Sequence, residues 1–114
     1  MTIERRGTTR RYSDSVAFGD TVYLVEVAQN LDGDISAQTR EVLASVEQTL
    51  ISAGSDKSRL LQVTIYLADI TEIGAMNAVW DDWVPEGCAP ARACVQAKLA
   101  SPGYRIEIVV QAAR

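Results

Sequence analysis

The residues best suited to chemistry lie in two stretches near the C-terminal end of the chain. Residues 89–96 carry Arg92 and Cys94 among small and apolar residues, and residues 104–110 carry Glu107 within an apolar run. Both stretches predict strands, and because side chains alternate along a strand, Arg92 and Cys94 share one face. A guanidinium on one strand and a carboxylate on another suggest a site for a small anion. The alternative is that both groups are solvated on polar strand faces, as charged groups mostly are.

The composition excludes several other chemistries. The chain has 114 residues and no histidine, which removes a Ser-His-Asp triad, a Cys-His pair and histidine-bound metals. Its two cysteines, Cys88 and Cys94, lack the close spacing of a redox or zinc site and do not make a disulfide framework. We therefore expect no metal and no cofactor, and nothing in the sequence assigns a role to Cys88.

The charge balance disfavours nucleic acid as a partner. The formal net charge is −4, so a phosphate backbone would be repelled on average, and a nuclease role is disfavoured with it. We interpret the arginines near the N-terminus as a solvated segment; these are Arg5, Arg6, Arg10 and Arg11.

The chain has no uncharged apolar run of about 18 residues, and no apolar region follows its Arg-rich beginning. We therefore expect neither membrane spanning nor secretion. The cysteine usage favours a reducing, cytoplasmic location.

The length indicates one domain, residues 1–114, and hydrophobic periodicity predicts its elements. The first helix should begin at a cap residue, Asp34 or Ser36, and end at Gly54. We expect, in chain order, strands at 2–6, 11–18 and 21–28, a helix at 36–53, a strand at 59–67, a helix from Asp69 or Thr71 to residue 84, and strands at 89–96 and 104–110.

Within these elements, alternation places Leu61 on the buried face of the strand at 59–67. In the second helix, Asn77 lies on the apolar stripe, where a buried amide needs hydrogen-bond partners. We favour a tie to a neighbouring loop over a ligand contact for Asn77, and core positions for Trp80 and Trp83.

The order of elements predicts a mixed sheet with both helices on one face, since strand–helix–strand crossovers imply parallel strands. The other face of the sheet is then left uncovered. A domain of this size with a bare sheet face needs a partner, and self-association is the usual answer.

Seven short motifs occur in an order and spacing similar to those of one family. Together they resemble the Rid family of reactive intermediate deaminases, YjgF type. The length and the Asn30-Leu31-Asp32 loop look most like its short YoaB-type members. The motifs are Tyr12-Ser13-x-x-Val16, Gln38-Thr39, Ala53-Gly54-Ser55, Val63-Thr64-x-Tyr66-Leu67-x-Asp69, Ala75-Met76-Asn77-x-x-Trp80, Ala89-Pro90-Ala91-Arg92-x-Cys94-Val95 and Ile106-Glu107-Ile108-x-x-x-Ala112.

The resemblance implies a chorismate-mutase-like α+β fold, a mixed sheet with two helices on one face, assembled as a homotrimer with ligand clefts between subunits. It also implies that the last strand inserts elsewhere in the sheet, although residues 100–103 look like a hairpin loop. We follow the family pattern here.

The implied activity is cofactor-free hydrolysis of 2-imino and 2-enamino acids to 2-oxo acids and ammonia. By resemblance, Arg92 anchors the substrate carboxylate, for which a planar guanidinium is well suited. Glu107 matches the acid near the attacking water. Cys94 matches a position that lines the cleft mainly through its backbone, and Tyr12 matches an aromatic at the cleft mouth from the neighbouring subunit.

The match breaks at Val25 and Glu26, where the family usually has a hydroxyl residue and a glycine. If Glu26 faces the cleft, its charge competes with a substrate carboxylate for Arg92 by several kcal/mol at about 4 Å. If Glu26 turns to solvent or pairs with an arginine, the activity survives. The alternative function is a non-catalytic trimer that binds a small carboxylate metabolite.

Overall fold

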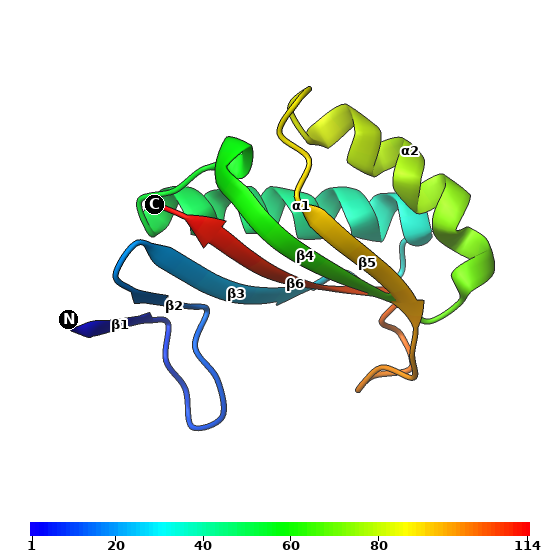
Figure 1. Cartoon of the computed structure of the whole chain (residues 1–114). Coiled ribbons are helices and arrows are strands. Elements are labelled where there is room, and N and C mark those ends of the chain that lie inside the picture. Colours follow the sequence, from blue (N-terminus) through cyan, green and yellow to red (C-terminus); the bar gives the residue numbers. More distant parts are fainter.

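A computed structural model describes residues 1–114 and consists of a six-stranded sheet with two α-helices on one face (Figure 1). Neither helix has the length and apolar character needed to cross a membrane. The elements are β1 (Ile3–Arg6), β2 (Ser15–Phe18), β3 (Thr21–Val27), α1 (Ile35–Ser52), the 3₁₀ turn η1 (Lys57–Arg59), β4 (Leu60–Leu67), the 3₁₀ turn η2 (Ile70–Glu72), α2 (Ile73–Trp83), β5 (Ala91–Gln96) and β6 (Ile106–Ala113).

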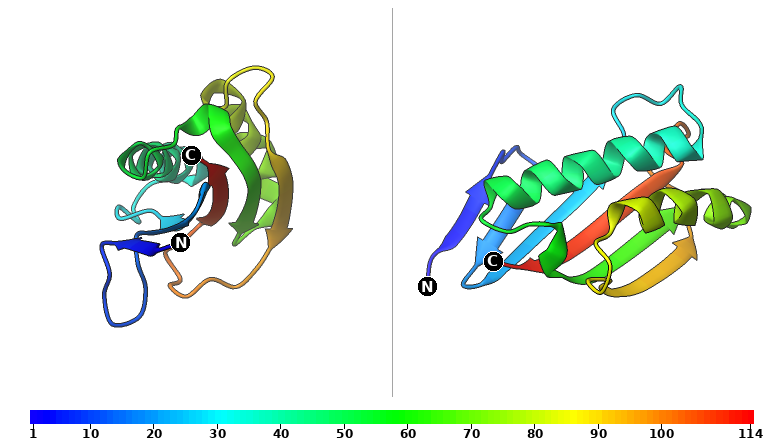
Figure 2. Two further views of the ribbon diagram at one scale, coloured as in Figure 1. Left: turned by 60° about the vertical axis from the view of Figure 1, so that its left-hand side comes forward. Right: turned by 90° about the horizontal axis from the view of Figure 1, so that it is seen from above.

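The sheet has the strand order β1-β2-β3-β6-β4-β5. Only β4 and β5 pair in parallel, and every other neighbouring pair is antiparallel. β6 lies between β3 and β4, so no hairpin joins it to β5 and the insertion that we expected is confirmed. Both helices cross the same face of the sheet, with α1 over β3 and β6 (Figure 2). The mixed α+β fold predicted from the sequence is therefore correct.

The second strand is shorter than we predicted. Only Ser15–Phe18 pair with the sheet, and residues 7–14 form a loop that projects from it (Figure 1). Polar side chains bond within this loop: Thr9 Oγ1 donates to the Tyr12 carbonyl at 3.2 Å, and the Thr8 and Ser13 hydroxyls lie 2.8 Å apart. These local hydrogen bonds give the backbone an alternative to strand pairing.

The strand β4 begins with an irregularity that the alternation pattern missed. Leu60 is 8% exposed whereas Leu61 is 50% exposed, so the prediction that Leu61 is buried was wrong. The register with β6 shifts between Leu60 and Gln62. An extra residue at a β-bulge reverses the faces on one side of it, which places Leu60 in the core.

The helix α1 begins and ends at residues that the sequence marks. The side chain of Asp34 accepts a hydrogen bond from the Ala37 amide at 2.9 Å, which makes Asp34 the cap. Gly54 follows the helix with φ of 87°, a conformation that favours glycine.

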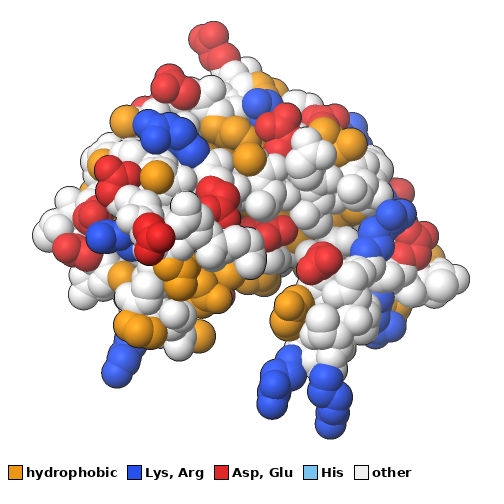
Figure 3. Space-filling model, turned by 180° about the vertical axis from the view of Figure 1, so that it is seen from behind, with side chains coloured by type: hydrophobic (Ala, Val, Ile, Leu, Met, Phe, Trp, Pro, Cys, Tyr) orange, Lys and Arg blue, Asp and Glu red, His pale blue; other side chains and the backbone are white.

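The uncovered face of the sheet carries a stripe of exposed apolar side chains. Ile3, Phe18, Tyr23, Val25 and Val95 are each between 42% and 50% exposed. Their register places them opposite the helix side of the sheet. Figure 3 shows hydrophobic side chains gathered in the hollow on the lower side of the molecule. Such a surface is typical of an interface with another protein.

Gln38 connects α1 to the segment that leads into β6. Its side chain is fully buried, its Nε2 donates to the Gly103 carbonyl at 2.9 Å, and its Oε1 accepts from the Arg105 amide at 2.9 Å. One amide thus satisfies two backbone groups in a region without regular structure. This contact ties the segment just before β6 to α1.

We predict that Gln38→Leu lowers the free energy of unfolding by about 1–3 kcal/mol, because the two backbone groups lose their partner. Urea unfolding measures the change. The matched control is Gln48→Leu on the same helix, where the side chain is exposed and forms no hydrogen bond. A loss no larger than that of the control would contradict the role assigned to Gln38.

Candidate carboxylate-binding site

Arg92 lies on the edge strand β5 and is held by two side chains of α2. Its Nη2 donates to Asn77 Oδ1 at 2.9 Å, and its Cζ lies 5.2 Å from the centroid of the Trp80 ring. Arg92 pairs with Val63 in the sheet, so its side chain starts on the helix-covered face. A neutral acceptor and an aromatic face orient a guanidinium without cancelling its charge.

The guanidinium of Arg92 has no carboxylate partner in the chain. The ion pairs are formed by other residues, namely Lys57–Glu47, Arg105–Glu72 and Arg114–Glu4. Arg92 is exposed, so its remaining N–H groups are available to a ligand. The arrangement fits a bidentate contact with a small carboxylate.

We predicted that Asn77 ties α2 to a loop, and this was wrong. Its side chain instead accepts a hydrogen bond from the Arg92 side chain. Trp80 is 5% exposed and belongs to the core, as predicted, and it also presents its ring to Arg92. The sequence did carry a signal that Asn77 and Trp80 act together, because residues three apart lie on one face of a helix. The sequence did not show which strand would face Asn77.

Cys94 lies on the same side of β5 as Arg92, paired with Ile65 and packed against the core. Burial raises the pKa of the Cys94 thiol, and the positive charge of Arg92 lowers it by a smaller amount. The thiol therefore stays protonated at neutral pH, which disfavours nucleophilic attack.

Glu107 lies on the other face of the sheet. In β6 it pairs with Val27 of β3 and Tyr66 of β4, and it is half-buried. Because β4 separates β6 from β5, Arg92 and Glu107 are about 10 Å apart across the strands and point to opposite faces. A single chain therefore does not bring the guanidinium and this carboxylate together.

Glu26 lies on the helix-covered face of the sheet, beneath α1. Its Oε1 accepts a hydrogen bond from Thr49 Oγ1 at 3.0 Å. Two strands separate β3 from β5, which puts these residues about 14 Å apart across the sheet. Within the chain, Glu26 thus does not compete with a ligand for Arg92. The neighbouring Val25 side chain points to the other face of the sheet, which is uncovered, and is exposed there.

Tyr12 lies in the loop between β1 and β2, at the edge of the sheet opposite to β5, and is 64% exposed. Of the six candidate site residues, only Arg92 and Cys94 therefore lie at the β5 edge. The other four lie elsewhere: Glu107 and Val25 on the uncovered face, Glu26 beneath α1, and Tyr12 at the far edge.

The fold is that of a small α+β protein with two helices on one face of a mixed sheet, and its edge strand carries an arginine without an ion-pair partner. A family model described as Endoribonuclease L-PSP matches residues 2–114. The RutC family protein YoaB of Escherichia coli K12 is 45% identical over 113 residues, which are 99% of each chain. The chain belongs to this family, which includes YjgF and Rid proteins.

Solved structures agree with this assignment. NMB1025, a YjgF family member from Neisseria meningitidis, is 43% identical with a TM-score of 0.97, and the match covers 100% of this chain and 96% of that one. The Rid family protein YyfA from Yersinia pestis is 26% identical with a TM-score of 0.87, covering 94% and 90% of the chains. The resemblance that we inferred from the seven motifs is confirmed.

The position of Glu26 predicts a pH-dependent stability. Burial raises the pKa of this carboxyl, the hydrogen bond from Thr49 lowers it, and the charge of Asp14 raises it. A raised pKa favours folding at low pH, and this contribution is lost as the pH rises through the folded-state pKa. We expect Glu26→Gln to be more stable than the wild type at neutral pH, by less than about 1 kcal/mol because the site is partly solvated.

Urea unfolding at about pH 7 and below about pH 4 measures this difference, which should shrink at the lower pH. The control is Glu86→Gln, which removes an exposed carboxylate after α2. A Glu26→Gln variant that is less stable than the wild type at neutral pH would contradict the interpretation.

Proposed function

We propose that this protein is a cytoplasmic homotrimer that hydrolyses 2-imino and 2-enamino acids to 2-oxo acids and ammonia without a cofactor. The main support is the Arg92 guanidinium, which Asn77 and Trp80 orient while its charge stays unpaired. Such a group binds the carboxylate shared by these substrates through two parallel N–H bonds. The two free cysteines fit a reducing compartment.

The uncovered sheet face supports the assembly. Exposed apolar residues on it, such as Tyr23 and Val95, would be buried by neighbouring copies. Within one subunit, Arg92 lies far from Glu107 and Tyr12. We therefore propose that the edge of one subunit meets the uncovered face of the next. The site would then combine Arg92 of one copy with Glu107 of another.

In this site Arg92 would hold the substrate carboxylate and Glu107 would orient a water beside C2 of the imine. The water oxygen would bond to C2 while Glu107 takes a proton from it and the C=N electron pair moves to the nitrogen, to which Glu107 then returns the proton. The resulting carbinolamine expels ammonia as the C–N bond breaks, and its hydroxyl becomes the carbonyl of the 2-oxo acid. Positioning supplies most of the required rate, because imine hydrolysis has a modest barrier.

A second candidate is a trimer that binds a small carboxylate without turnover. Val25 favours it, because an apolar side chain stands where the family usually has a hydroxyl that contacts the ligand. We do not extend the endoribonuclease description of the family model to this chain, since the net charge of −4 and the absence of histidine disfavour it. Release of ammonia from freshly generated 2-iminopropionate distinguishes the two candidates.

We predict that Arg92→Ala reduces kcat/KM for ammonia release by about 100-fold or more, because two charge-assisted hydrogen bonds are lost. Arg92→Lys should recover little of the activity, since an ammonium cannot form the planar fork. The control is Arg10→Ala in the exposed loop, and light scattering checks that assembly is retained. Unchanged activity in Arg92→Ala would refute the assignment.

A mixture of two inactive variants tests the shared site. Arg92→Ala and Glu107→Gln chains, unfolded and refolded together, should regain activity, because some sites then combine the intact residue of each chain. Random assembly restores about a quarter of the sites. No recovery, with mixed trimers shown by native mass spectrometry, would show that the two residues do not act across subunits.

A further inference from the structure

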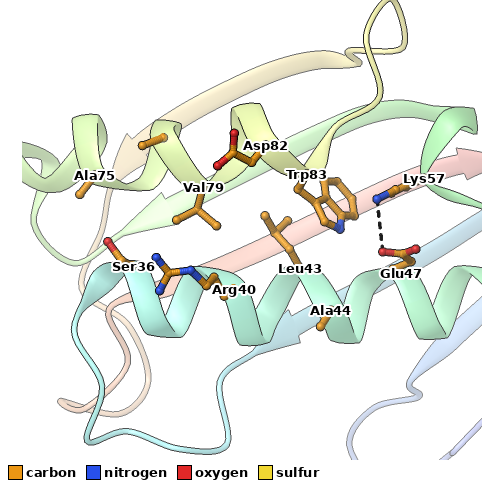
Figure 4. A pocket seen from close by; sticks show the side chains of 11 residues that line it. Ser36, Arg40, Leu43, Ala44, Glu47, Lys57, Ala75, Val79, Asp82 and Trp83 are labelled. Atoms are coloured by element: carbon orange, nitrogen blue, oxygen red, sulfur yellow. Dashed lines mark ion pairs between the residues drawn. The ribbon is translucent and has the colours of Figure 1, made fainter.

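A groove of about 430 Å³ lies between α1 and α2, on the face of the sheet opposite to the exposed apolar stripe (Figure 4). This volume is within the range of about 300–1,000 Å³ of small-molecule sites. The groove would remain open in an assembly that buries the uncovered sheet face. None of the six candidate residues of the carboxylate site lines it.

Short side chains create the hollow. Ala44 on α1 and Ala75 and Ala78 on α2 face the space between the helices and are too small to fill it. The apolar wall consists of Leu43, Val79 and the Trp83 ring.

The groove carries one unpaired charge of each sign. Lys57 and Glu47 compensate each other at 3.6 Å. Arg40 of α1 and Asp82 of α2 are exposed, and neither forms an ion pair or a side-chain hydrogen bond. Figure 4 shows them reaching in from opposite helices, on either side of Val79. The two charges are therefore available to a ligand that carries both signs.

The Trp83 ring is held by packing and by the ammonium group of Lys57, whose Nζ lies 5.6 Å from the ring centroid. Its indole Nε1 is the one buried side-chain nitrogen or oxygen without a hydrogen-bond partner. The ring lies against Trp80 with 5.6 Å between centroids and an angle of 47° between planes. The ring lines the groove and offers an apolar surface to a group placed there.

We propose that this groove binds a zwitterionic α-amino acid with an apolar side chain. Arg40 takes the carboxylate, Asp82 takes the ammonium group, and the side chain lies on Leu43, Val79 and Trp83. An anion or a cation alone satisfies only one of the two free charges, so the groove selects for a molecule that carries both. The proposal is independent of the deaminase activity.

Isothermal titration of the full chain with L-leucine tests this, and tryptophan fluorescence supplies a second readout because Trp83 lines the groove. We expect saturable binding. Isocaproate lacks the ammonium group and isopentylamine lacks the carboxylate, so each should bind about tenfold more weakly or worse. Equal affinity for either comparator, or no saturable binding of leucine, would overturn the proposal.

Variants locate the binding. Arg40→Gln and Asp82→Asn should each weaken leucine binding about tenfold or more. The matched controls Arg10→Gln and Asp81→Asn remove the same charges from exposed positions outside the groove and should leave the affinity unchanged.

Arg92→Ala separates this site from the proposed catalytic site, because leucine binding should survive in that variant. Loss of binding in Arg92→Ala, with binding retained in Arg40→Gln and Asp82→Asn, would place the amino acid at Arg92 and refute the groove.

Discussion

The alternation of side chains across a single sheet is the constraint on which the rest of the structure depends. Two helices cover one face, so the residues of β3, β4 and β6 that point toward them form the core. The residues that alternate with these core residues along each strand point to the opposite face, which no element of the chain covers. As a result, Arg92 starts on one side of the sheet and Glu107 lies on the other. The alternation that forms the core thus also places the two candidate catalytic residues, Arg92 and Glu107, on opposite faces of the sheet.

Neutral side chains hold the candidate anchor in place. Arg105 and Arg114 each form an ion pair with a carboxylate of the same chain, which compensates their positive charge. Arg92 instead contacts the amide of Asn77 and the ring of Trp80, which orient it and leave its charge for another molecule. The same helix presents Asp82 and Trp83 to the groove beside α1. Different residues of α2 thus orient Arg92 and line the groove.

Several features could be predicted because they depend on neighbours in the chain. Asp34 caps its helix and Gly54 ends it, since capping and backbone conformation are local. Prediction failed where one residue changed the pattern: the bulge before Gln62 put Leu60 into the core in place of Leu61. It also failed at Tyr12, whose loop bonds to itself instead of extending β2.

The sequence by itself determined the periods of the helices and strands, most of the faces that would be buried and the family, because these follow from patterns of residue type along the chain. Only the tertiary structure decided which side chains meet. Asn77 contacts Arg92 across 15 positions, and Glu26 contacts Thr49 across 23. Local periodicity carries no information about such contacts, which depend on the strand order and on how each helix lies over the sheet.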